Sequence, residues 1–325
     1  MSAFKVEVIR VGTVTKHPSA DTLSIMKFLE FPIIFRTTDF KEGDVAVYVP
    51  IDSVVPESDS RWDFLRDKTG KFHGRIKAKS LRGIYSRGLL SPADPSWSVG
   101  EDVTKLLGLK HYEPPEDIVM GGENESSPGW FAVYTDIESV RRYPNVFQIG
   151  EPVVIREKIH GANGRAAWHE GRLWVGSHKN VKADRRTIWW GVAEQYGLEE
   201  KLRRFPGVEF FFEVYGQVQS LKYGLAGRLG LVLFDALDVS TRKYFDDKDF
   251  LRMVGELGLP MVPTLYEGEW RGLEAHKALA DGKSLISGAE NIREGFVVKP
   301  KRERSILELD RVILKLHGEE FTLEF

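Results

Sequence analysis

The chain has 325 residues, with 46 lysines and arginines against 48 aspartates and glutamates, so its formal net charge is −2. This length favours two domains, and 42% hydrophobic with 29% charged residues excludes disorder as the main state. The absence of cysteine excludes disulfides, cysteine-bound zinc, iron–sulfur clusters and a thiol nucleophile. No secretory signal is visible, and apolar stretches such as residues 229–237 are too short to span a bilayer, so we expect a soluble, cytoplasmic protein.

Residues 1–112 have the pattern of an all-β domain. Alternating or continuous apolar runs predict strands at residues 4–8, 23–28 and 45–49. Pro32 restricts its segment to an edge strand or a turn, and only residues 103–109 show a helical pattern. Short strands without a long helix predict a small OB-like β-barrel.

Three stretches of this domain are similar in order and wording to the tRNA-binding OB modules of some aminoacyl-tRNA synthetases: residues 17–23, 41–44 and 81–90. The resemblance implies an OB-like nucleic-acid-binding domain over residues 1–112. The alternative is a β-barrel whose turns simply require glycine and proline.

A basic stretch lies in the last third of this domain. Residues 61–87 hold nine lysines and arginines against two acids, with aromatic residues interleaved at Trp62, Phe64, Phe72 and Tyr85. This mixture favours a surface that follows a nucleic-acid backbone and stacks on bases, over the alternative of a solvated charged face.

The predicted domain boundary is a linker at residues 113–130, because prolines and glycines gather there and residues 113–138 hold seven acids and no lysine or arginine. Residues 131–325 form the second domain. Its expected strands are 153–157, 164–169, 173–176, 208–214, 229–237, 295–299 and 311–316, with helices at 187–196 and 247–256. This is an α+β pattern with much antiparallel sheet. Neither a P-loop nor a Gly-x-Gly-x-x-Gly sequence is present, so phosphates must be held by side chains.

Charged residues stand inside or at the ends of the apolar strands of this domain. Lys158 lies at the end of an apolar strand, three residues before Gly161, a position that suits a nucleophile. Taken without the other motifs, this pattern is more often an exposed lysine at a strand end. Four more apolar strands carry such a residue, where an unpaired buried charge is costly: Glu213, Asp235, Glu294 with Lys299, and Lys315. Charged residues placed in this way on five strands in succession predict a functional site.

Together these segments resemble the motifs of the covalent nucleotidyltransferases, the superfamily of ATP-dependent ligases and mRNA capping enzymes. Glu-Lys-Ile-His-Gly-x-Asn at residues 157–163 is similar to the nick-sealing, ligase 2-like RNA ligase branch, and the preceding OB module is similar to the Deinococcus-type RNA ligases. The family often has Lys-x-Lys in its last motif. Here Lys315 precedes His317, so whether His317 replaces the second lysine stays open.

The resemblance implies an OB-like barrel followed by a nucleotidyltransferase (adenylyltransferase) domain. It implies an ATP-dependent RNA ligase that joins 3′-OH and 5′-phosphate ends at nicks in duplexes or RNA/DNA hybrids, through lysyl-AMP and an adenylylated 5′ end. The cofactors would be ATP and Mg²⁺, with Mn²⁺ as a substitute, because Mg²⁺ binds through few carboxylates and substrate phosphates. No membrane or protein partner is expected.

The resemblance also implies a role for each matching residue. In the nucleotide site, Lys158 would be the nucleophile, Glu213 the ribose ligand and Phe234 the adenine platform, with Glu157 at the adenine edge and Ile159 beside it. Without the motifs, Phe234 would be assigned to the core.

The remaining roles concern phosphate, metal and RNA. Lys299 and Lys315 would bind the α-phosphate and, with the metal, lower the pKa of Lys158. Glu294 would position the hydrated metal, and Asn163, Ser177 and Lys179 would serve strand joining or nucleic-acid contact. Ser177, His178 and Lys179 match a phosphate-contacting motif of the family, and which of the three makes that contact stays open. Asp235 and His160 would contact these catalytic side chains and not the substrate itself.

Two alternatives of other classes remain. A DNA ligase or a capping guanylyltransferase would keep the covalent lysine, but these enzymes usually have aspartate where this chain has His160. A non-catalytic RNA-binding protein would form no covalent nucleotide at all.

Overall fold

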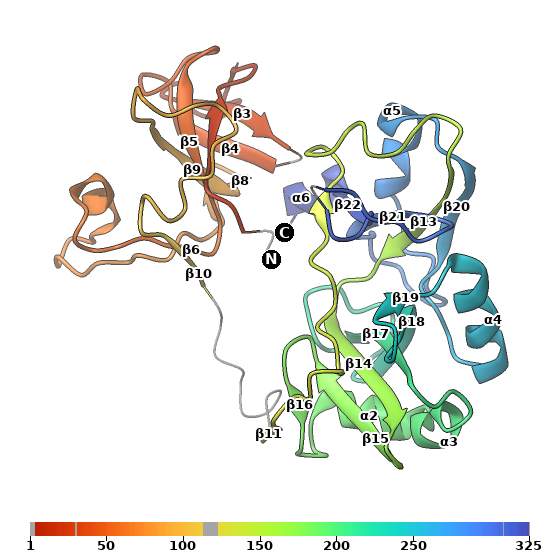
Figure 1. Cartoon of the computed structure of the whole chain (residues 1–325). Coiled ribbons are helices and arrows are strands. Elements are labelled where there is room, and N and C mark those ends of the chain that lie inside the picture. Colours follow the sequence, from red (N-terminus) through yellow and green to blue (C-terminus); the bar gives the residue numbers. More distant parts are fainter. Residues whose placement is uncertain (1–3, 30, 113–122, 308, 325) are drawn as a thin grey trace. The chain divides into compact units, whose positions relative to one another are not determined.

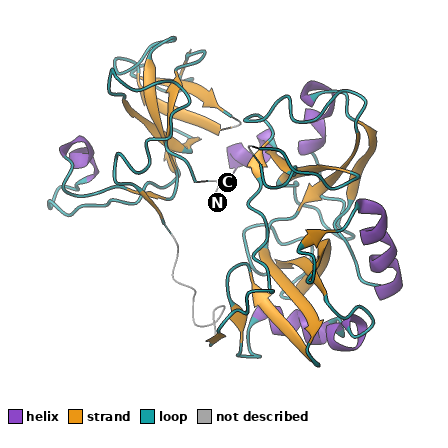
Figure 2. Ribbon diagram, in the orientation of Figure 1, coloured by secondary structure: helices purple, strands orange, loops and turns teal. Residues whose placement is uncertain are grey.

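The computed structural model describes residues 4–29, 31–112, 123–307 and 309–324 (Figures 1 and 2). It divides into two compact units, residues 116–321 and residues 1–115, the latter grouped with 322–325. Most of the expected linker, residues 113–122, lies outside the described residues, so the exact boundaries stay a prediction. None of the helices in the described part of the chain is long and apolar enough to cross a membrane.

The first unit is built from short antiparallel strands. One sheet has the order β1 (Glu7–Arg10), β5 (Val45–Pro50), β9 (Gly88–Pro92), and another the order β2 (Thr15–Lys16), β3 (Leu23–Phe28), β4 (Phe31–Arg36). Two strand pairs complete it: β6 (Ser53–Val54) with β10 (Lys110–His111), and β7 (Lys79–Leu81) with β8 (Ile84–Ser86). Apolar side chains from the two larger sheets fill its cores.

Three local expectations for this unit can be compared with the structure. Pro32 lies in the edge strand β4, as predicted. The helix expected at residues 103–109 is wrong: only a turn forms there, and Gly108 ends it with φ of 64°. Trp62, in the 3₁₀ helix η1 (Ser60–Leu65), is fully buried and therefore offers no stacking platform, whereas Phe64 is 65% exposed.

The second unit contains two sheets. The seven-stranded antiparallel sheet has the order β11 (Asn124–Glu125), β16 (Val181–Lys182), β15 (Arg172–Ser177), β14 (Ala162–His169), β17 (Val208–Gly216), β18 (Leu229–Asp238), β19 (Lys243–Tyr244). The five-stranded sheet has the order β12 (Glu138–Ser139), β22 (Leu314–His317), β21 (Gly295–Pro300), β13 (Pro152–Lys158), β20 (Thr264–Glu269), with β12 parallel to β22. Residues 124–125 of the expected linker thus belong to a sheet of this unit.

Helices cover one face of the seven-stranded sheet. The helices α2 (Ile188–Gln195), α3 (Leu198–Leu202) and α4 (Asp247–Leu257) lie along this sheet (Figure 1). Their side chains pack in one core with residues of β14, β17 and β18. Trp189 and Trp190 belong to this core and not to an exposed surface. Among the described residues, three further short helices are α5 (Leu273–His276), η2 (Lys277–Ala280) and α6 (Glu319–Glu324).

The expected strands and both expected helices form, with one informative difference. The strand predicted at residues 311–316 begins only at Leu314. Arg311 instead lies in the preceding loop, where its guanidinium is buried and pairs with Asp235 and Glu303.

Candidate active site

A pocket of about 330 Å³ in the second unit is lined by residues of both sheets. It brings together most of the residues that the sequence singles out: Glu157, Lys158, Ile159, Asn163, His178, Glu213, Phe234, Lys299 and Lys315. They come from strands far apart in the chain, and Glu294 reaches the same place through its contact with Lys158. The predicted constellation therefore forms one site.

Gly161, the residue before β14, lines the pocket and lets the chain approach β17 closely. A Cβ atom on Gly161 would lie 2.1 Å from the carbonyl oxygen of Val214, which no side chain permits. The same close approach allows the Gly161 N–H to donate to the carboxylate of Glu213. The glycine of the Lys-x-x-Gly segment is thus required by backbone contact, as its spacing predicts.

Lys158, at the end of β13, faces carboxylates. Its Nζ lies 2.8 Å from Oε2 of Glu294. Burial alone would lower the pKa of Lys158, but the charges of Glu294 and Glu213 outweigh burial and raise this pKa above its ordinary value. The Lys299 Nζ is held 3.1 Å from Asp235 and from Glu303, so its charge is matched by carboxylates of its own. That Lys299 and Lys315, with a bound metal, lower the pKa of Lys158 stays a prediction.

The two carboxylates beside Lys158 differ in their protonation. Burial would raise the pKa of Glu294, but Lys158 and the side chains of His160 and His317 hold it well below its usual range. The ring nitrogens of these histidines lie 3.4 Å and 3.6 Å from the carboxylate. Burial, with a further contribution from Glu294, raises the pKa of Glu213 to about 8 against the opposing charge of Lys158. Glu294 is therefore the ionised partner.

A β-bulge brings Phe234 to the pocket. Across β17 and β18, Phe211 pairs with Asp235 and Phe212 pairs with Leu233, so Phe234 is the extra residue. Such a bulge turns side chains out of strict alternation. Phe234 is half-buried, lines the pocket and makes an edge contact with Tyr134, with ring centroids 4.9 Å apart. It is therefore not simply a core residue.

Glu157 offers an unused acceptor at the pocket. Its Oε2 accepts a hydrogen bond of 2.7 Å from the backbone N–H of Leu285. Its Oε1 is buried and has no hydrogen-bond partner among the described residues. Burial raises the pKa of this carboxyl against hydrogen bonds from Ser284 and Leu285 and the charge of Arg293. An orphaned acceptor in a pocket suits the amino group of a base.

Of the three residues expected to contact phosphate, only His178 lines the pocket. Ser177 is buried, and Lys179 is exposed without lining the pocket. Arg165, fully buried, fixes this segment by donating to the carbonyl oxygens of Ser177 and Lys179 at 3.0 Å each. Arg165 was missed, although a charged residue in an apolar strand is the same signal that singled out Glu213.

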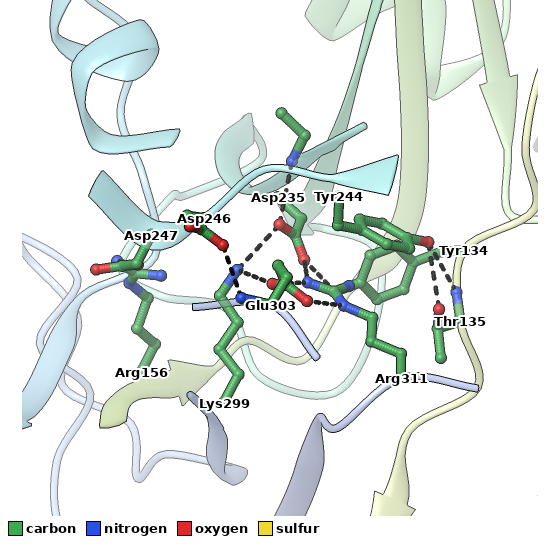
Figure 3. A network of polar contacts seen from close by, with 11 residues as sticks. Tyr134, Thr135, Arg156, Asp235, Tyr244, Asp246, Asp247, Lys299, Glu303 and Arg311 are labelled. Atoms are coloured by element: carbon green, nitrogen blue, oxygen red, sulfur yellow. Dashed lines mark hydrogen bonds and ion pairs between the residues drawn. The ribbon is translucent and has the colours of Figure 1, made fainter. Parts of the chain in front are cut away.

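A buried polar network surrounds Asp235, the residue that follows Phe234 in the chain (Figure 3). Asp235 and Glu303 each contact both Lys299 and Arg311, and Tyr134 donates to Asp235 at 2.7 Å. Beside them, Arg156 lines the pocket and pairs with Asp247 at 2.5 Å. The members that the sequence reasoning missed are Tyr134, Arg156, Glu303 and Arg311.

The donor set of the site suits a metal held mainly by waters and phosphates. Among the described residues, no group of three or more His, Asp or Glu side chains is arranged to hold a metal ion. Two carboxylates, Glu213 and Glu294, flank Lys158. Few carboxylates beside a space for phosphates is the arrangement that Mg²⁺ prefers.

Comparison with known proteins finds matches for both units of the chain. A model described as RNA ligase matches residues 151–317, and a model described as an OB-fold domain matches residues 5–93. A solved apo form of a Naegleria gruberi RNA ligase mutant is 24% identical, covers 99% of this chain and 98% of that chain, and superposes with a TM-score of 0.79. A form of that ligase with pyrophosphate is also 24% identical, covers 97% of both chains and has a TM-score of 0.76.

A mutant of the same ligase with ATP and Mn is 24% identical, covers 98% of both chains and has a TM-score of 0.77. No curated protein matches the sequence. The matches confirm the predicted fold, an OB-fold domain followed by a nucleotidyltransferase domain of the ligase type.

Proposed function

Because the chain belongs to the RNA ligase family, we propose that it is an ATP-dependent ligase that joins 3′-OH and 5′-phosphate ends of RNA at breaks held in a duplex. The observation that carries this proposal is the position of Lys158, which enters a pocket also lined by Glu157, Glu213 and Phe234. An OB-fold domain before the ligase domain further supports the Deinococcus-type, nick-sealing branch.

In the first step, the Nζ of Lys158 attacks the α-phosphorus of ATP, a P–N bond forms and pyrophosphate leaves. The purine stacks on Phe234, its amino group donates to Oε1 of Glu157, and Glu213 binds the ribose. Lys299 of β21 and Lys315 of β22, which line the pocket from the same five-stranded sheet that carries Lys158, bind the α-phosphate. These roles follow from the family resemblance together with the position of each side chain.

Lys158 must lose a proton before it attacks. The carboxylates of Glu294 and Glu213 raise its pKa in the absence of nucleotide. The proposed cofactor is Mg²⁺, or Mn²⁺ in its place, and its charge would neutralise these carboxylates and the phosphates. Glu294 would hold it through water, while Lys158 stays aligned toward the pocket.

In the second step, an oxygen of the RNA 5′-phosphate attacks the phosphorus of lysyl-AMP, and Lys158 is released. In the third step, the 3′-OH attacks the adenylylated 5′ end, the strand is sealed and AMP leaves. Asn163 lines the pocket with a buried Oδ1 that has no hydrogen-bond partner among the described residues, so it is available to the RNA ends. His178 is the pocket-facing member of its segment.

The RNA partner is proposed to contact the first unit at its basic stretch. Arg61, Arg66 and Arg75 are engaged in ion pairs with acids of the same unit. Exposed Lys77, Lys79 and Arg82, in contrast, form no ion pair within the part of the chain that the structure describes. Cations of this kind are free to bind backbone phosphates.

The test is covalent labelling. The purified protein is incubated with Mg²⁺ and α-labelled ATP or GTP, beside a Lys158→Ala variant, and then denatured. We expect label from ATP on the wild type and none on the variant. Label from GTP alone would indicate a capping-type enzyme, and no label from either nucleotide would refute the ligase proposal in favour of simple RNA binding.

A further inference from the structure

The four charged side chains of the network around Asp235 form a closed arrangement in which each cation touches both carboxylates. We propose that Arg311 is a positioning residue for ATP. Two carboxylates, Asp235 and Glu303, hold Lys299, whose single positive charge balances only one of them. The guanidinium of Arg311 balances the other, so the ammonium group of Lys299 faces the phosphates as part of a neutral group. This rests on the proposed function of the pocket and adds a residue that no motif of the sequence indicated.

The contacts fix Lys299 from two sides. Its Nζ lies 3.1 Å from Asp235 Oδ1 and 3.1 Å from Glu303 Oε1. An ammonium group has three donors, so one is left for the pocket that Lys299 lines. Lys299 is only 4% exposed, so solvent cannot easily supply the missing charge or donors.

Arg311 holds the same carboxylates from behind. It binds Glu303 through two nitrogens, with Nε at 2.8 Å from Oε2 and Nη2 at 2.6 Å from Oε1. Its Nη2 also donates to Asp235 Oδ2 at 2.6 Å. The guanidinium lies over the ring of Tyr244, at 3.6 Å from the centroid, which keeps its plane fixed (Figure 3).

The charge count shows why Arg311 matters to a phosphate ligand. With Arg311, two cations face two carboxylates and the group is neutral. Without it, Lys299 alone faces Asp235 and Glu303, and the group carries one net negative charge next to the triphosphate. Repulsion at this depth is screened little by solvent. Removing Glu303 together with Arg311 restores neutrality, since Asp235 and Lys299 then pair alone.

The experiment measures the ATP concentration for half-maximal formation of labelled protein with full-length variants. Arg311→Gln is expected to raise this concentration by about tenfold or more. The double variant Arg311→Gln/Glu303→Gln is expected to return to within about threefold of the wild type, because the group is neutral again. A merely structural role predicts instead that the double variant, which loses further contacts around Lys299, needs at least as much ATP as Arg311→Gln.

Arg304→Gln is the matched control. Arg304 lies in the same loop, pairs with Glu151 at 2.7 Å and does not line the pocket. It should lower the unfolding temperature without changing the ATP requirement. The inference is overturned if folded Arg311→Gln needs no more ATP than wild type, or if the double variant is no better than Arg311→Gln. If Arg311→Gln fails to fold, the double variant still decides, because an ATP requirement about tenfold above that of the wild type would overturn the inference. An unlabelled wild type would instead refute the proposed function.

Discussion

Burial raises the pKa of a carboxyl group inside the seven-stranded sheet, that of Glu209. Glu209 is fully buried on β17, where Oε2 accepts a 2.8 Å hydrogen bond from the N–H of Ala132. The nearest cation is Arg165, whose Nη1 is 3.9 Å away. Burial raises the pKa of Glu209 to about 8 against these two favourable contacts. Glu209 is therefore protonated at neutral pH in the folded protein.

Glu209 predicts a specific dependence of stability on pH. The unfolded chain releases this proton near pH 4.5 and the folded chain near 8, so unfolding releases a proton between these values and stability falls as pH rises. Glu209→Gln cannot ionise and keeps an oxygen for Ala132. We expect its unfolding temperature at pH 8 to exceed that of the wild type by about 2 °C or more, with a smaller difference at acidic pH. Parallel melting curves across this range would mean that Glu209 is ionised when folded.

At the scale of elements, the meeting of β14 and β17 depends on one glycine. Gly161→Ala places a Cβ atom 2.1 Å from Val214 O and 3.0 Å from the Cγ of Glu213. The strands must then separate, so we expect a loss of about 1–3 kcal/mol in the free energy of unfolding and little labelling by ATP. Urea unfolding and the labelling assay measure the two effects.

Gly191→Ala is the control for that substitution. Gly191 lies inside α2, and a Cβ atom there meets no other atom within 4 Å. It should stabilise the protein by about 0.5–1 kcal/mol, because alanine favours the helix. A Gly161→Ala protein as stable and active as this control would contradict the role of close backbone approach.

The strands that carry the site were predictable from the sequence, but the contacts between them were not. Lys158, Glu213 and Lys299 each stand in an apolar strand, a local signal that needs no knowledge of pairing. The network around Asp235 joins Tyr134 to Arg311, 177 residues apart, and no local pattern encodes such a contact. The bulge at Phe234 likewise depends on the register between two strands and not on either one alone.

At the scale of the whole molecule, each unit has its own cores. The clusters around Trp62 and Met26 contain residues of the first unit only, and the clusters around Phe210 and Phe296 contain residues of the second. All residues lining the proposed ATP pocket belong to the second unit. The chemistry of lysine adenylylation and the binding of RNA should therefore be separable.

Deleting residues 1–112 should leave labelling of Lys158 by ATP intact and impair the sealing of nicked RNA, since the pocket survives while a basic surface is lost. In the full chain, Lys77→Gln/Lys79→Gln/Arg82→Gln should have the same direction of effect without truncation. Loss of three phosphate contacts should also reduce the slope of log affinity for nicked duplex against log salt concentration by about 2 to 3. Lys105→Gln, an exposed lysine of the same unit outside the basic stretch, is the control. A truncated protein that seals nicks at the full rate would exclude the first unit from strand joining and show that the ligase domain alone is sufficient.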